Sequence, residues 1–160
     1  MKLDNSKTII SFRIRLFAVT VLFLAYIIMS YAAKFFKLTL FGMSDTFWTI
    51  IFAFVWLFIA LIPMFLNYQY VNYSDEGDTI IFRYFTSGLV GGKKNSVEID
   101  KRTFAGYKSE KKLFGLVWSI TLYQNFKEGV AKYPPIHISA LNKEERSKVL
   151  RSLNQYAPGA

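Results

Sequence analysis

The run FWTIIFAFVWLFIALIPMFL, Phe47–Leu66, decides the class of fold, because its 20 residues include no charged side chain. As a helix it would measure about 30 Å, the thickness of the hydrocarbon core of a bilayer. Apolar side chains occupy every position from Phe54 to Phe58, so no polar face is left for the surface of a soluble bundle. The run therefore predicts a transmembrane helix.

A second run, Leu16–Ala33 (LFAVTVLFLAYIIMSYAA), has 18 residues and again no charge. It would measure about 27 Å as a helix, and it predicts a second span. The alternative is a cleaved signal peptide, because Ser30-Tyr31-Ala32 has the small-x-small form of a cleavage site. The length of the run and of the segment before it favour a retained span, so we expect a two-helix hairpin.

The placement of lysine and arginine predicts the orientation of this hairpin. The connector 34–46 holds two basic side chains, whereas four precede the first run: Lys2, Lys7, Arg13 and Arg15. Basic segments resist translocation, so both termini are predicted to lie in the cytoplasm of a bacterial inner (cytoplasmic) membrane, with the four N-terminal basic groups contacting anionic lipid. The predicted division is residues 1–66, a leader with a transmembrane hairpin (spans about 16–33 and 47–66), and residues 67–160, a cytoplasmic domain.

The cytoplasmic domain carries 14 basic and 9 acidic side chains and shows the alternation of β-strands. The stretches TIIFRYF, VEID and WSITLY alternate apolar and polar residues, and turn-forming residues separate them. In WSITLY, Trp118, Ile120 and Leu122 share one face. The other face is formed by Ser119, Thr121 and Tyr123, as in a sheet with one wet face. The pattern predicts a small antiparallel sheet or partly open barrel.

The chain closes with PPIHISALNKEERSKVL, residues 134–150. A proline pair suits the start or edge of a strand, in which Ile136 and Ile138 would face inward. Asn142 is the predicted N-cap of a helix, and Glu145 completes a capping box. The helix has an apolar stripe formed by Val149, Leu150, Leu153 and Tyr156, so we expect it to pack on the sheet.

This order of elements, about six or seven antiparallel strands followed by one amphipathic helix and ending in PPIHISALNKEERSKVLRSL, resembles the bacterial PH-like (pleckstrin-homology-like) domains over about residues 68–156. Two preceding spans are a familiar arrangement in that family. The resemblance implies a binding or oligomerising module rather than an enzyme. Phosphoinositide-binding members carry a basic cluster between their first two strands, whereas here that loop reads SDEGD, and the basic pair Lys93-Lys94 falls in the next loop.

The residues available for catalysis are few. The chain has one histidine, His137, for which we expect a solvated place on a strand face, and it has no cysteine, which excludes disulfides, thiolate catalysis and thiolate metal sites. We therefore expect no enzyme activity, no cofactor, no metal and no small-molecule substrate. The spans hold no ionisable acid or base, which argues against transport, and the basic charges lie beside the spans, which favours lipid over nucleic acid as their partner.

The sequence thus predicts a non-enzymatic membrane protein that serves as an adaptor, assembling with itself or acting as an accessory subunit of a larger membrane-protein complex. The alternative is a sensor that binds anionic lipid headgroups or a phosphorylated ligand through a basic surface. Its candidate ligand-binding or partner-binding residues are Arg83, Lys93 and Lys94.

Overall fold

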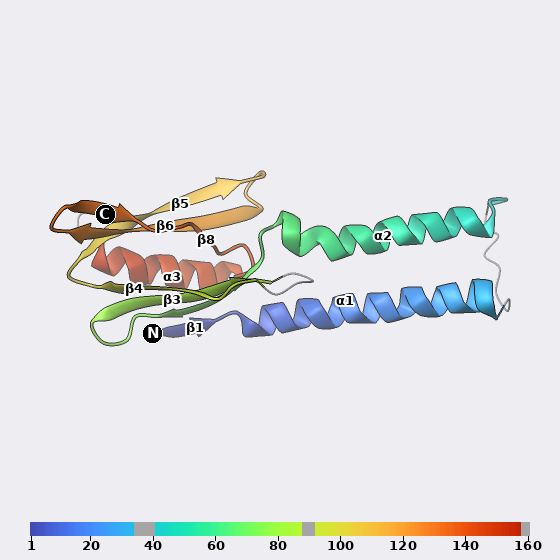
Figure 1. The fold of residues 1–160 in the computed structure, drawn as a ribbon, viewed down its shortest axis with the longest axis horizontal. Coiled ribbons are helices and arrows are strands. Elements are labelled where there is room, and N and C mark those ends of the chain that lie inside the picture. The colour runs from blue at the N-terminus through green and yellow to red at the C-terminus, as the bar shows by residue number, and fades with distance from the viewer. Residues whose placement is uncertain (34–40, 88–91, 158–160) are drawn as a thin grey trace. The chain divides into compact units, whose positions relative to one another are not determined.

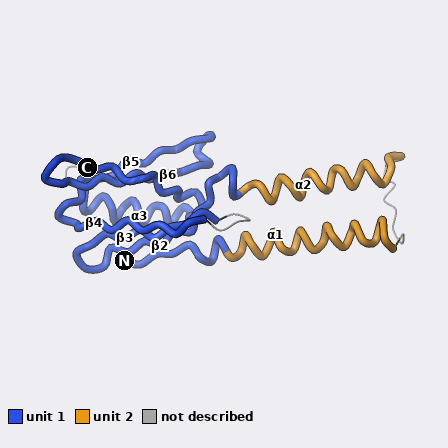
Figure 2. Tube along the Cα trace, viewed as in Figure 1, with its two compact units in different colours: residues 1–9, 63–160 blue, residues 10–62 orange. Residues whose placement is uncertain are grey.

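The computed structural model describes residues 1–33, 41–87 and 92–157 (Figure 1). It separates into two compact units, one formed by Met1–Ile9 with Pro63–Ala160 and one formed by Ile10–Ile62 (Figure 2). We call them the sheet unit and the helical unit, and describe each by itself. The division differs from the predicted boundary after residue 66, because the first nine residues belong to the sheet unit and not to the helical hairpin.

Two long apolar helices form the helical unit. Helix α1 spans Ser6–Ile27 and continues as a short π-helix, η1 (Ile28–Ala32), and helix α2 spans Asp45–Phe65. In the most apolar window of each helix, 0% and 11% of the residues are buried, whereas a core helix of a soluble protein is mostly buried. By length and composition, both helices are long and apolar enough to cross a membrane.

A few polar contacts join α1 to α2. The indole Nε1 of Trp56 donates to the Thr20 hydroxyl at 2.9 Å, and the Trp56 ring stacks on Phe23 with the centroids 6.1 Å apart. Nearer η1, the Tyr26 hydroxyl lies 3.2 Å from a carboxylate oxygen of Asp45. Hydrogen bonds of this kind, together with close packing, join apolar helices in lipid, where the hydrophobic effect does not draw them together.

Eight strands form two antiparallel sheets in the sheet unit. Sheet A has the order β1 (Lys2–Asp4), β2 (Gln69–Ser74), β3 (Thr79–Thr86) and β4 (Asn95–Asp100). Sheet B contains β5 (Phe104–Lys112), β6 (Val117–Phe126), β7 (Gly129–Lys132) and β8 (Ile136–His137), with β6 central. The structure confirms the expectation of an antiparallel sheet domain built from short strands.

Strand β1 is an element that the sequence pattern did not predict. It pairs with β2 in the register Leu3↔Tyr73, and Leu3 packs against the core. A strand of three residues is too short to show alternation, so only its tertiary partner reveals it.

One hydrophobic core lies between the two sheets and helix α3 (Lys143–Tyr156), which is drawn between them in Figure 1. Most of the inward-facing positions predicted from alternation and helical spacing are confirmed as buried: Ile80, Phe82, Tyr84, Val97, Ile99, Ile120, Leu122, Ile136, Ile138, Val149 and Leu153. The others, Trp118, Leu150 and Tyr156, pack against the core but are only partly buried. The capping box is also confirmed, since Glu145 N donates to Asn142 Oδ1 and Asn142 N to Glu145 Oε2, both at 2.8 Å.

The wet face predicted for WSITLY is wrong. Ser119 and Thr121 are 6% and 7% exposed, although they point away from the core. Both stand on the central strand β6, where Lys108 of β5 lies opposite Thr121 and His137 of β8 lies opposite Ser119. Long side chains on the flanking strands shield short ones between them.

Candidate functional site

A groove of about 740 Å³ runs between the β5–β6 hairpin and helix α3. Its volume is in the range of small-molecule and peptide pockets. Three of its lining residues come from the hairpin and the rest from α3: Lys111, Gly115 and Trp118, then Lys143, Arg146, Ser147, Leu150, Arg151 and Asn154.

The lining of the groove is strongly basic. Four cationic side chains, Lys111, Lys143, Arg146 and Arg151, face it, and none of the described lining residues is acidic. Glu144 lies on the neighbouring surface of α3, where it lines a second, smaller hollow. Cations held along a concave wall concentrate positive potential there, so the groove is suited to an anionic ligand.

Trp118 organises the cations at one end of the groove. The Nζ of Lys111 lies 4.1 Å from the centroid of its ring, and the Cζ of Arg146 lies 4.8 Å away. The indole Nε1 donates to the carbonyl of Gly115 at 2.7 Å, which fixes the ring. Cation–π contacts therefore hold both charges in place before a ligand arrives.

Strand β5, which contributes Lys111 to the groove, has an open edge. In the described part of the chain β5 pairs with β6 alone, which leaves the backbone groups of its other edge unpaired by a strand. At the far end the Tyr107 hydroxyl donates to Asn154 Oδ1 at 2.6 Å, and burial raises the pKa of Tyr107, so it stays a neutral donor. From Lys143 to Asn154 helix α3 rises about 16 Å, the length of about five extended residues.

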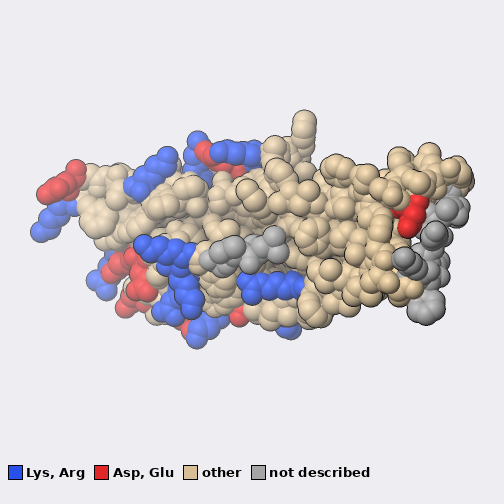
Figure 3. Space-filling model, turned by 45° about the vertical axis from the view of Figure 1, so that its right-hand side comes forward, with Lys and Arg blue, Asp and Glu red and all other residues tan. Residues whose placement is uncertain are grey.

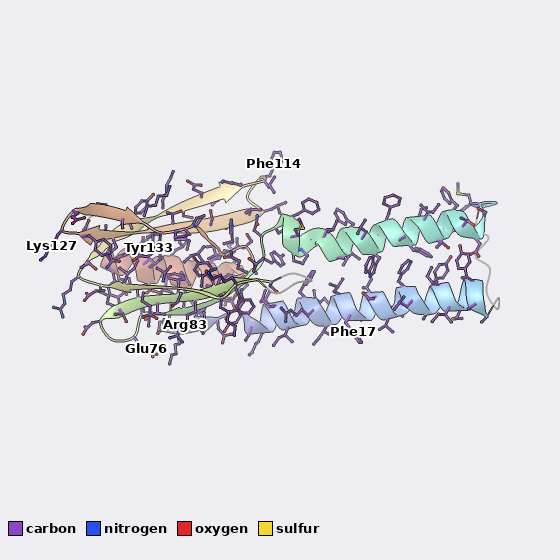
Figure 4. The ribbon with its side chains drawn as sticks, viewed as in Figure 1. Phe17, Glu76, Arg83, Phe114, Lys127 and Tyr133 are labelled. Carbon is purple, nitrogen blue, oxygen red and sulfur yellow. The ribbon has the colours of Figure 1, made fainter. Side chains whose placement is uncertain are left out.

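The turn between β5 and β6 exposes large apolar side chains, and we call Leu113–Leu116 the apolar tip. Leu113, Phe114 and Leu116 are 56%, 106% and 61% exposed. Leu113 and Phe114 have φ of 49° and 55°, in the left-handed region, and Gly115 N donates to the carbonyl of Lys112 at 3.2 Å. In Figure 4 Phe114 projects from this end of the sheet unit, and Lys127 lies at the opposite end.

The ligand-binding residues predicted from sequence lie elsewhere, on sheet A. Arg83 stands on β3 with a guanidinium nitrogen 3.9 Å from a Glu98 carboxylate oxygen. Lys93 and Lys94 are exposed immediately before β4, and residues 88–91 of the same loop lie outside the described residues. The structure therefore does not bring these three basic residues to the groove.

The predicted lipid-contacting residues are divided between two elements. Lys2 lies in β1, with its Nζ 3.3 Å from a carboxylate oxygen of Glu76, while Lys7, Arg13 and Arg15 lie exposed in α1. Figure 3 shows charged side chains gathered over the sheet unit, while the visible face of the helical unit is largely uncharged. Lys2 is thus ion-paired within the sheet unit and separated by Asn5 from the helix that carries the other three.

His137 is half-buried rather than freely solvated. Its backbone N–H donates to Gln69 Oε1 at 2.8 Å, and its Nδ1 is buried without a hydrogen-bond partner among the described residues. Burial, with a smaller effect from the charge of Lys112, lowers its pKa, so the ring is neutral near pH 7. No group of three His, Cys, Asp or Glu side chains that could hold a metal occurs among the described residues.

Sequence reasoning missed both the groove and the apolar tip. The available signal for the tip was LFGL between two predicted strands, at a position where turns usually carry polar residues. The groove gave no such signal, because its basic residues come from β5 and from α3. Comparisons with known protein families, curated proteins and solved structures found no match, so the function is argued from this geometry.

Proposed function

We propose that this chain is a membrane-anchored, non-enzymatic adaptor whose sheet unit binds an acidic, extended segment of a partner membrane protein in the groove between β5 and α3. The observation that carries the proposal is a groove with four cationic side chains and no acidic one among its described lining residues. One of the cations, Lys111, stands on β5, whose other edge is unpaired by any described strand.

Anchoring is supported by two helices that are long and apolar enough to span a bilayer. The excess of basic residues before the first apolar run, Leu16–Ala33, favours a bacterial inner membrane with both termini in the cytoplasm. Two antiparallel sheets followed by a C-terminal helix are the features by which the sheet unit resembles a PH-like domain, a class of binding modules. A single histidine and the lack of cysteine support a binding role over catalysis.

The binding mode follows from the free edge of β5. An extended segment adds to this edge through backbone hydrogen bonds, as in other complexes that extend a sheet. Its carboxylates then meet Lys111, Arg146 and Arg151, and arginine forms strong charge-assisted bonds with them. Because the groove is about five extended residues long, a short acidic stretch fills it.

Fluorescein-labelled hexaglutamate, titrated against the full chain in phosphatidylcholine nanodiscs, tests this proposal by fluorescence anisotropy. Arg146→Glu, which reverses a charge in the groove, is expected to weaken binding about tenfold or more. Lys148→Glu is the matched control: it makes the same change of charge on the same helix, but it lines the second hollow and not the groove. Equal effects of the two variants, or no saturable binding, would contradict the proposal.

Photo-crosslinking in native membranes tests the partner. A photoreactive residue in place of Ser147, which lines the groove, is expected to form an adduct at an acidic segment of one membrane protein, and Arg146→Glu is expected to abolish it. The same residue in place of Glu128, in the β6–β7 turn, is the control. If millimolar inorganic phosphate displaces hexaglutamate and no adduct forms, the ligand of the groove is a phosphorylated compound and not a protein segment, which would contradict the proposal.

A further inference from the structure

We infer that the apolar tip inserts into the interface of an anionic bilayer and seats the sheet unit on the membrane. This inference rests on the exposure, backbone and surroundings of Leu113–Leu116, and it does not depend on what the groove binds.

The first observation is that the large apolar side chains of the tip are exposed and have no role in the core of the sheet unit. The side chain of Phe114 is as open as it would be in an isolated peptide, and Leu113 and Leu116 beside it are more than half exposed. Single exposed apolar residues are ordinary, but three large ones within four consecutive residues are a concentration of exposed apolar surface of the kind that marks contact with a membrane or another molecule.

The second observation is the backbone that presents these side chains. Leu113 and Phe114 both have positive φ in a turn closed by Gly115 N and the carbonyl of Lys112. Residues with φ in this range are usually Gly or Asn, because bulky side chains are strained in the left-handed region. The chain places leucine and phenylalanine where folding alone favours asparagine and glycine, and strain of this sort is characteristic of functional sites.

The third observation is the charge around the tip. Lys111 and Lys112 precede it directly, and Lys143 lines the adjoining end of the groove. One carboxylate among the described residues, Glu110, stands nearby on β5, where it accepts from Lys108 Nζ at 2.9 Å and lies 4.0 Å from Lys112 Nζ. An apolar projection surrounded by lysines matches a layer of anionic headgroups above hydrocarbon, which is why we assign lipid and not a second protein as its partner.

The fourth observation is the position of the tip within the sheet unit. It adjoins the start of β6, where Ser119 pairs with His137, whose backbone N–H donates to Gln69 at 2.8 Å. Gln69 begins β2, and its carbonyl accepts from Asn5 Nδ2 at 2.9 Å. The start of β6 is therefore at the same end of the sheet unit as Gln69 and Asn5.

Both candidate spans connect to the sheet unit at that end. Helix α2 ends at Phe65, so the chain reaches Gln69 within about 14 Å even when fully extended, and α1 begins directly after Asn5. If the two helices cross a bilayer, chain connectivity alone holds the end of the unit that bears the tip near its surface.

A chain without cysteine allows this inference to be tested with a single label on the full-length protein. Leu116→Cys, which leaves Phe114 intact, is labelled with the fluorophore NBD and reconstituted in phosphatidylcholine vesicles with and without phosphatidylglycerol. Val130→Cys is the control, because Val130 is 62% exposed and follows the opposite end of β6.

We expect blue-shifted emission at position 116, quenching by doxyl-labelled lipid, and quenching by aqueous iodide about fivefold weaker than at position 130. Phosphatidylglycerol should strengthen the lipid quenching, and Phe114→Ser in the labelled chain should remove most of it. The thermal stability of Phe114→Ser should not fall, because the fully exposed Phe114 ring supports no core contact.

Two results would overturn the inference. In one, iodide quenches the label at 116 as strongly as the label at 130, which means that the tip stays in water. In the other, the label is shielded from both iodide and doxyl lipid, which means that a protein surface covers the tip.

Discussion

Asn5 and Val71 exchange two hydrogen bonds across the join between the first strand and the first helix. The side-chain Oδ1 of Asn5 accepts from Val71 N at 2.9 Å, and its backbone N–H donates to the Val71 carbonyl at 3.3 Å. Asn5 is 1% exposed, and its amide nitrogen also donates to the carbonyl of Gln69. This one residue therefore fixes the start of α1 to the strand that follows α2.

Removing this side chain should destabilise the sheet unit. Asn5→Ala leaves the N–H of Val71 and the carbonyl of Gln69 without these partners, and such unpaired buried groups cost about 1–3 kcal/mol. Thermal unfolding of the full chain in mild detergent measures the loss. Asn95→Ala is the control, since Asn95 is exposed and its side-chain Nδ2 donates to the carbonyl of Lys93 two residues away. A loss equal to that of Asn5→Ala would contradict the assigned role.

A buried polar cluster should make the stability of the sheet unit sensitive to acid. Asp75 accepts from the Ser152 hydroxyl, which lies 2.6 Å from the Tyr73 hydroxyl, and so joins β2 to α3. Burial alone would raise the pKa of Asp75, but hydrogen bonds from the Met1 amino group and from Ser152 outweigh it and lower the pKa below 3.8. The folded pKa is thus below the unfolded one, so this stabilisation is complete above about pH 4 and is lost as the pH falls through the folded value.

Asp75→Asn should therefore lower the melting temperature at pH 7, by the equivalent of about 2 kcal/mol, and should weaken its further decline between pH 4 and pH 2. The exposed Asp78 gives the matched variant, Asp78→Asn, for which we expect little change. Parallel acid curves for wild type and Asp75→Asn would show that Asp75 is not the responsible group.

Substitutions in the strained turn should separate the effect of the tip on the stability of the fold from its effect on membrane contact. Replacing Leu113 and Phe114 by Asn and Gly, the residues that this turn favours, should stabilise the fold by about 1–2 kcal/mol. The same double variant removes two of the side chains assigned to lipid, so it should melt higher while losing lipid quenching at position 116. A variant that melts lower would show that the tip supports the fold.

The hydrogen bond between Thr20 of α1 and Trp56 of α2 should contribute modestly to the stability of the helical unit. Thr20→Val leaves the Trp56 indole N–H without its partner, and hydrogen bonds between helices in lipid are worth about 0.6–1.7 kcal/mol. Denaturation of the reconstituted chain by sodium dodecyl sulfate measures the change. Ile50→Val, at a half-exposed position of α2, should be close to neutral, and an equal loss there would indicate packing rather than hydrogen bonding.

Local sequence patterns were sufficient where each signal lies within one element. The uncharged runs predicted both long helices, the alternation from Ile80 to Leu122 predicted buried strand positions, and Asn142 with Glu145 predicted the start of α3. The physical reason is that period, capping and length are properties of neighbouring residues. The role of Arg83, Lys93 and Lys94 in binding stays a prediction.

The amino-acid sequence by itself determined that two segments prefer an apolar environment and that the rest forms a small antiparallel sheet domain with a terminal helix, because hydrophobic run length and periodicity act locally. Only the tertiary structure decided that residues 2–4 complete sheet A, that Ser119 is buried, and that Lys111 and Arg146 meet over Trp118. These features depend on residues far apart in the chain, which strand pairing and core packing bring together. Strand pairing and core packing cannot be predicted from any short stretch of sequence.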